Sequence, residues 1–64
     1  MTRYWLTQIQ HEGRRWSGRA SITPDAWVAV DSAYGSRREI LADDESPEEH
    51  ARRLLREIVE TRHA

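Results

Sequence analysis

The sequence contains no cysteine, lysine, asparagine or phenylalanine, and among its 64 residues only three are glycine and two are proline. The absence of cysteine excludes disulfide bonds, thiolate zinc sites and thiol catalysis, and it fits a protein of a reducing compartment. No apolar run approaches the roughly 20 residues that span a bilayer, and the apolar start at residues 3–6 is too short for a secretory signal peptide. We therefore expect a cytoplasmic protein, with a single domain over residues 1–64 and no membrane segment.

Charged side chains are plentiful, but the two signs are unevenly distributed along the chain. Residues 1–38 carry six arginines against three carboxylates, whereas residues 39–64 carry four arginines against eight carboxylates. Every basic side chain other than the three histidines is an arginine, and arginine makes planar contacts with carboxylates, phosphates and aromatic rings. The same composition is typical of a GC-rich bacterial or phage genome. The first half of the chain is thus basic and the second half acidic.

The clearest local pattern is a capped helix between residues 46 and 63. Ser46 and Glu49 have the spacing of a capping box, and Pro47 occupies the first helical position, where no backbone donor is needed. Apolar side chains then recur on one face, at Ala51, Leu54, Leu55, Ile58 and Val59. The pattern predicts a helix over residues 47–62 whose single apolar stripe packs against another element. On its outer side, glutamates and arginines four residues apart, such as Glu49 and Arg53, indicate a solvated face rather than a binding face.

The residues before this helix have the pattern of short strands. Residues 3–10 and 14–22 combine aromatic, β-branched and alternating apolar positions, and the turn between them contains a glycine, so they predict a β-hairpin. Residues 26–31 predict a third strand after a Pro-Asp turn, and residues 37–41 form either a short fourth strand or the approach to the helix. The expected fold class is α+β: a three- or four-stranded antiparallel sheet, β-β-β-(β)-α, packed against one C-terminal helix.

The pattern of the first strand leaves its buried side undecided. The odd-numbered residues from Trp5 to Ile9 would lie on one side of the sheet, and the even-numbered residues from Tyr4 to Gln8 on the other. Both sets are partly apolar, so either one can face the core. In the third strand, Val30 is expected to face the helix, with Trp27 on the opposite side.

The sequence offers little to a catalytic or metal site. His11, His50 and His63 share no metal-ligand spacing, so we interpret each as a surface histidine. The acidic residues 43–45 stand where the positive end of a helix dipole favours negative charge, and the fixed pattern of a calcium loop is missing. No serine has the sequence context of an activated nucleophile, and there is no glycine-rich phosphate loop. We expect no enzyme activity, no cofactor, no metal and no small-molecule substrate.

Two kinds of binding fit the remaining features, and both use the sheet. The leading hypothesis is a small binding module that docks to a protein partner or self-associates as a homodimer through a face or edge of the sheet. Aromatic and arginine side chains are enriched at interface hot spots, and the contacts expected here are Trp5, Arg15, Arg19, Trp27 and Tyr34. The alternative is a nucleic-acid-binding domain that contacts DNA or RNA phosphates through Arg14, Arg15, Arg19, Arg37 and Arg38. Either hypothesis depends on whether Arg15 and Arg19 face solvent beside Trp27 or are neutralised by nearby acids.

Overall fold

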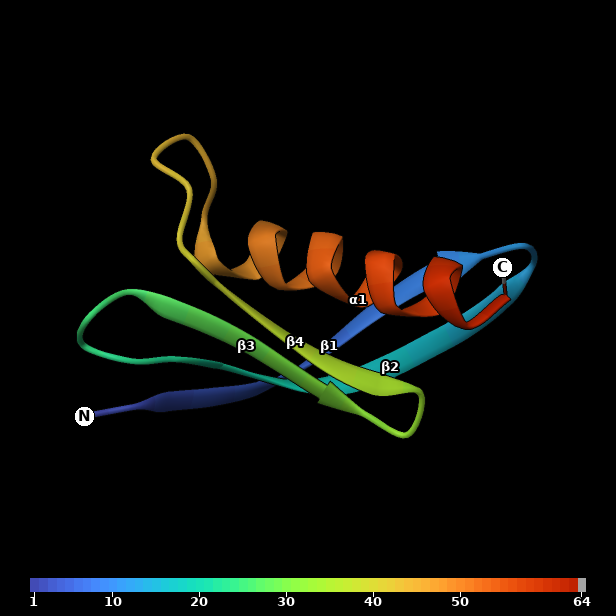
Figure 1. The fold of residues 1–64 in the computed structure, drawn as a ribbon, viewed down its shortest axis with the longest axis horizontal. Coiled ribbons are helices and arrows are strands. Elements are labelled where there is room, and N and C mark those ends of the chain that lie inside the picture. Colours follow the sequence, from blue (N-terminus) through green and yellow to red (C-terminus); the bar gives the residue numbers. More distant parts are fainter. Residues whose placement is uncertain (64) are drawn as a thin grey trace.

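The fold is a four-stranded antiparallel sheet with one helix lying across a single face of it (Figure 1). The computed structural model describes residues 1–63. Its elements are β1 (Arg3–His11), β2 (Arg14–Ile22), β3 (Trp27–Ser32), β4 (Gly35–Ile40) and α1 (Pro47–His63). The strands follow one another across the sheet in the order β1-β2-β3-β4, so each neighbour in sequence is also a neighbour in space. The α+β prediction is confirmed, and the fourth strand that the sequence left open is present.

Helix α1 begins at the residue that the capping box predicts. The Ser46 side-chain oxygen accepts a hydrogen bond from the Glu49 backbone N–H at 3.2 Å, and the Glu49 carboxylate accepts one from the Ser46 backbone N–H at 3.3 Å. These bonds satisfy two donors that the first turn of a helix leaves without partners. Pro47 is the first helical residue, as expected from its missing donor.

The core lies between the apolar stripe of α1 and the side of the sheet that faces it. All five residues of the stripe are buried. They pack against five buried sheet residues: Ile9, Trp16, Ala20, Val28 and Val30. In β1 the odd-numbered side chains face the helix, because Thr7 and Ile9 are buried and Trp5 packs against the core. This decides the orientation of the first strand and leaves its even-numbered side chains on the far side of the sheet.

Strand β4 contributes little apolar surface to the core and joins the sheet through its backbone. It pairs with β3 over its whole length, from Trp27 opposite Ile40 to Ser32 opposite Gly35, although all its side chains are exposed or half-buried. The hairpin turn is fixed by Ser32, whose hydroxyl donates to the Gly35 carbonyl at 2.8 Å and accepts from the Tyr34 backbone N–H at 3.2 Å. A strand stabilised in this way has little apolar pattern, which explains why the sequence only weakly indicates it.

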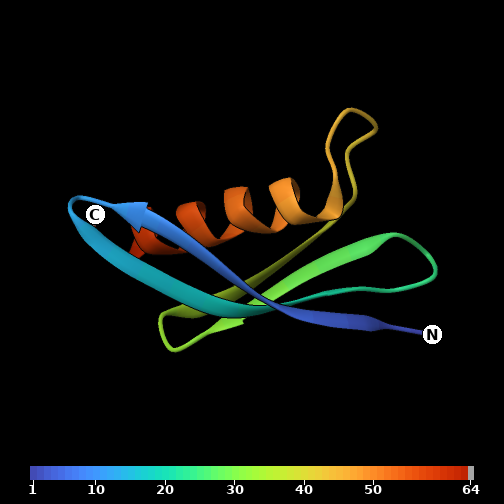
Figure 2. The ribbon, with the colours of Figure 1, turned by 180° about the vertical axis from the view of Figure 1, so that it is seen from behind.

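The two faces of the sheet differ in what covers them. The helix lies along one face, and no element of residues 1–63 lies on the other (Figure 2). An antiparallel sheet tolerates this arrangement, because one face can pack on a core while the other meets water. No helix among the described residues combines the length and the apolar character that a membrane span requires.

Candidate functional site

The candidate site is the face of the sheet opposite α1, which we call the open face. The strand registers define it: Leu6 lies opposite Arg19, and Arg19 lies opposite Asp31. Directly opposed side chains of antiparallel strands lie on the same side of a sheet, and side chains alternate sides along each strand. The open face therefore comprises Tyr4, Leu6, Gln8, Gln10, Arg15, Ser17, Arg19, Ser21, Trp27, Ala29, Asp31, Ser36, Arg38 and Ile40.

Exposed apolar side chains gather on the open face. Apart from Met1, the large apolar residues that are exposed among residues 1–63 all belong to it: Tyr4 (67 % exposed), Leu6 (75 %), Trp27 (39 %) and Ile40 (57 %). Trp27 and Ile40 are directly opposed on β3 and β4, whereas Tyr4 and Leu6 are successive outward residues of β1. A single exposed apolar residue is ordinary, but a concentration of them on one side of a small domain is typical of a docking surface.

The open face is also basic. It carries Arg15, Arg19 and Arg38, with Asp31 as its one carboxylate. No ion pair within residues 1–63 engages any of these three arginines. The guanidinium of Arg38 lies 5.4 Å from the centre of the Trp27 ring, within the range of a cation–π contact. The arginines are therefore not neutralised by acids of the same chain and remain available to a partner.

Three shallow hollows lie along the open face. One hollow lies at Leu6 and Arg19 on β1 and β2. A second lies at Asp31 and Arg38 on β3 and β4, and a third lies at Arg15 near the β1–β2 hairpin. All three open broadly to solvent, whereas sites for small molecules usually enclose most of their ligand. Their shape suits a partner that lies across the sheet.

Three of the five expected partner contacts lie on the open face: Arg15, Arg19 and Trp27. Arg15 is near the β1–β2 hairpin, whereas Trp27 lies toward the other end of the sheet. The other two lie elsewhere. Trp5 is half-buried on the helix-facing side of β1, where it packs against the core. Tyr34 lies in the β3–β4 turn and packs edge-on against Trp16, with the ring centres 4.8 Å apart at an interplanar angle of 74°. Both aromatic rings extend the core, so they contribute to the stability of the sheet rather than to its open face.

The arginines expected to bind nucleic acid are also divided between the two sides of the sheet. Arg14 lies on the helix-facing side of β2, with its guanidinium 5.5 Å from the centre of the Trp16 ring. Arg37 lies on the helix-facing side of β4, where it forms an ion pair with Glu57 at 3.5 Å and donates to the Thr61 hydroxyl at 3.4 Å. Arg15, Arg19 and Arg38 alone remain on the open face.

Leu6 and Ile40 belong to the open face but were not singled out from the sequence. Leu6 occupies an even-numbered position of the strand whose buried side was undecided, so its exposure follows only once Ile9 is known to be buried. Ile40 ends the strand that the sequence barely indicates. The alternation of side chains along each strand divides them into two sets, but it shows which set is exposed only after one residue of the strand is known to be buried.

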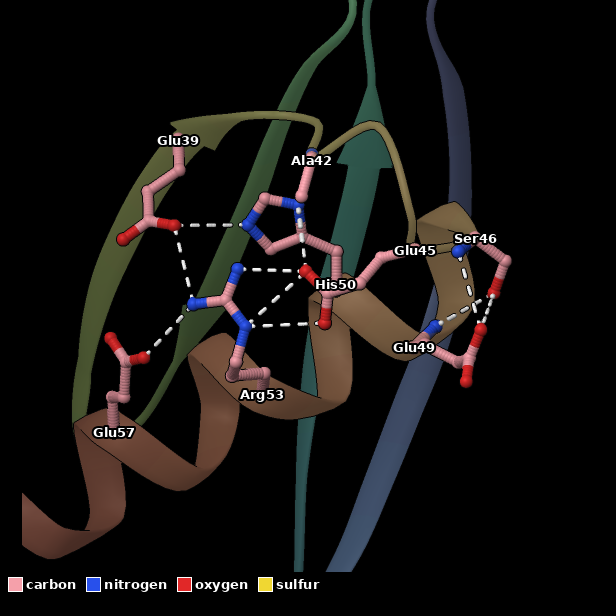
Figure 3. A network of polar contacts seen from close by, with 8 residues as sticks. All are labelled: Glu39, Ala42, Glu45, Ser46, Glu49, His50, Arg53 and Glu57. Atoms are coloured by element: carbon pink, nitrogen blue, oxygen red, sulfur yellow. Dashed lines mark hydrogen bonds and ion pairs between the residues drawn. The ribbon is translucent and has the colours of Figure 1, made fainter.

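A network of polar contacts joins the start of α1 to the end of β4 (Figure 3). His50 is fully buried, so the prediction of a surface histidine is wrong at this position. Its Nδ1 accepts a hydrogen bond from the Ala42 backbone N–H at 3.4 Å, and its Nε2 therefore carries the hydrogen that is donated to Glu39 at 3.0 Å. Because both ring nitrogens have partners, the imidazole can be buried without leaving a polar atom unsatisfied.

Arg53 gathers the carboxylates around this histidine. Its guanidinium donates to Glu45 at 2.8 Å, to Glu57 at 3.1 Å and to Glu39 at 3.4 Å. The expected pairing of Arg53 with Glu49 is not formed, because Glu49 caps the helix instead. The hydrogen bond from His50 and the charge of Arg53 lower the pKa of Glu39. Arg53 also lowers the pKa of Glu45.

The network around His50 joins α1 to β4 and so contributes to the stability of the domain. Within residues 1–63, no buried side-chain nitrogen or oxygen lacks a hydrogen-bond partner. No group of three or more histidine, aspartate or glutamate side chains in the described part of the chain is arranged to hold a metal ion.

Comparison of the chain with protein families, curated proteins and solved structures finds no match. The open face therefore remains the candidate functional site.

Proposed function

We propose that this chain is a small non-enzymatic binding module that docks a protein partner on the open face of its sheet. The observation that carries the proposal is the position of Tyr4, Leu6, Trp27 and Ile40, whose exposed side chains all lie on the face of the sheet that no element of residues 1–63 covers. Burial of apolar surface drives most protein association, at roughly 25 cal/mol per Å² removed from water. A cytoplasmic setting suits the module, since it has no cysteine.

The chemistry of the open face favours a protein over a nucleic acid. Leu6 and Ile40 are aliphatic and largely exposed. Burial of such side chains against apolar residues of a partner protein is favourable, whereas they offer no aromatic ring on which a base can stack. Arg19 and Arg38 lie beside these apolar residues and form no ion pair with another residue of 1–63. Arginine is also enriched at protein interfaces and their hot spots. The expected partner combines apolar side chains with carboxylates, which would pair with the arginines.

Site-specific photo-crosslinking in the cells that produce the protein tests this proposal. A benzoylphenylalanine in place of Ile40 reports on the open face, and the same residue in place of Arg56 reports on the exposed side of α1. We expect protein adducts from position 40 and few or none from position 56. Equal adducts from both positions would contradict the proposal, because contact would then be unrelated to the open face.

Binding of nucleic acid is the second candidate function, and one observation favours it. Arg38 stacks on the exposed ring of Trp27, an arrangement that can also grip a base and its phosphate. We would titrate isotope-labelled protein with a short DNA duplex and with a single-stranded RNA while following its amide resonances. Shifts confined to the open face that weaken steeply with added salt would favour this function over protein docking, because phosphate contacts release counterions.

A further inference from the structure

The outer edge of β1 has no partner strand. β1 pairs with β2 over nine consecutive residues, from Arg3 opposite Ile22 to His11 opposite Arg14. On its other side, no strand of residues 1–63 is hydrogen-bonded to it, since β1 is the first strand of the sheet (Figure 1). Every second residue of β1 therefore presents its backbone N–H and C=O groups outward, and such a row is a template for pairing with another strand.

Edge strands of soluble proteins usually carry features that prevent such pairing: short length, central charges, proline, or a bulge. β1 has none of them. It is nine residues long, its register with β2 is unbroken, and the seven residues from Tyr4 to Gln10 contain no charge, proline or glycine. Its one arginine, Arg3, and its one histidine, His11, lie at the two ends of the strand.

The opposite edge of the sheet provides a contrast within the same molecule. β4 has six residues, three of which, Arg37, Arg38 and Glu39, are consecutive charged side chains. It begins at Gly35, whose φ of +141° lies in a region that other residues rarely adopt. β4 thus has the protective features that β1 lacks, and the two edges of the sheet are suited to different roles.

We infer that β1 pairs antiparallel with β1 of a second copy of this chain, so that two sheets join into one of eight strands. A two-fold axis perpendicular to the sheet relates two identical antiparallel strands, and it keeps both helices on the same side. The open faces of the two copies then form one continuous surface. With the two strands paired about Thr7, the middle of β1, Leu6, which is 75 % exposed, comes to lie opposite Gln8 and diagonal to Leu6 of the second copy.

The distribution of charge favours a second copy paired at this edge over two copies stacked through their open faces. Antiparallel pairing about the middle of β1 brings uncharged residues together and places each Arg3 far from the other. Stacking two open faces would instead bring together two surfaces that each carry three arginines, Arg15, Arg19 and Arg38, and a single carboxylate, Asp31. Like charges in direct apposition oppose association. The pairing uses the edge of the sheet and does not depend on the proposed docking of a partner on its face.

A matched pair of lysine substitutions tests the inference by sedimentation velocity over a range of concentrations. Leu6→Lys and Ile40→Lys each replace an exposed aliphatic residue of the open face, one on each edge strand. We expect a dimer for the parent chain and for Ile40→Lys. Leu6→Lys should raise the dissociation constant of the dimer about tenfold, because it removes an apolar cross-strand contact and opposes two like charges. A parent chain that stays monomeric at every concentration overturns the inference, as does equal weakening by both substitutions.

Amide hydrogen exchange of the parent chain distinguishes edge pairing from stacking of faces. In an edge dimer the amides of residues 4–10 are all protected, because alternate ones bond to β2 and the others to the second copy. The amides of β4 should retain alternating protection, since its outer edge stays free. Alternating protection in both edge strands of a dimeric sample would refute the inference.

Discussion

Replacement of Leu55 by alanine should nearly abolish the stability of the domain. Leu55 is fully buried between α1 and the sheet, and burial of a leucine side chain contributes about 1.5–3 kcal/mol. The cavity left behind adds to this loss, so that Leu→Ala substitutions in a core cost about 2–5 kcal/mol. A domain of this size without disulfides or metals has a stability of roughly 3–5 kcal/mol. The variant should therefore be partly unfolded even without denaturant.

Leu6 offers a matched control for this experiment, because it is the same residue type but is 75 % exposed. At protein concentrations low enough to keep the chain monomeric, Leu6→Ala should change the free energy of unfolding by no more than about 0.5 kcal/mol, as surface substitutions usually do. Urea titrations followed by far-ultraviolet circular dichroism and by tryptophan fluorescence give both values. Equal losses for the two variants would refute the two-layer arrangement, in which α1 covers only one face of the sheet.

Three further outcomes are expected from the same titrations. Ser46→Ala should lower the free energy of unfolding by about 1 kcal/mol, because Ser46 caps α1 through the Glu49 N–H. Gly18→Ala should lower it by about 1–3 kcal/mol, since a Cβ at this position would lie 3.0 Å from the carbonyl oxygen of Asp31 on β3. The pKa of Glu39 is held below the 4.5 of a free glutamate, so its contribution to stability is present above that pH and is lost as the solution is made more acidic. Glu39→Gln should accordingly destabilise the protein near neutral pH and flatten the loss of stability between about pH 5 and pH 3.

The elements with strong local patterns were predictable from the sequence. Helix α1 carries its own start signal in Ser46 and Pro47, and its stripe has the period of a buried helical face, so its bounds came out nearly as expected. β2 alternates strictly between apolar and polar residues and was placed at the residues the structure shows. The orientation of β1 was not predictable, because both of its sides are partly apolar. It depends on the register with β2, which lies beyond the local pattern.

The environments of single residues were predictable only where they depend on near neighbours in sequence. His50 is buried because Glu39 and Ala42, from the end of β4 and the loop after it, supply its hydrogen bonds. Arg37 leaves the open face because it binds Glu57 and Thr61 of α1, which lie twenty or more positions away. Pairings across such distances follow from the packing of the helix on the sheet, and no local spacing encodes them. Trp27 was correctly placed opposite the helix-facing side, because side chains alternate along a strand and the branched aliphatic pair Val28 and Val30 occupies the buried side.

The central claim is that the open face is the interaction surface. Its most direct test compares the yield of protein adducts from a photo-crosslinker at position 40 in two variants with reversed charges. One variant carries Arg19→Glu and Arg38→Glu on the open face, and the other carries Arg52→Glu and Arg56→Glu on the exposed side of α1. The two double variants change the net charge equally, and none of the four arginines forms an ion pair within residues 1–63. Circular dichroism confirms that each variant is folded before the yields are compared. We expect the adduct yield to fall about tenfold in the first variant and to stay nearly unchanged in the second, whereas equal losses in both, or a larger loss in the second, would contradict the assignment.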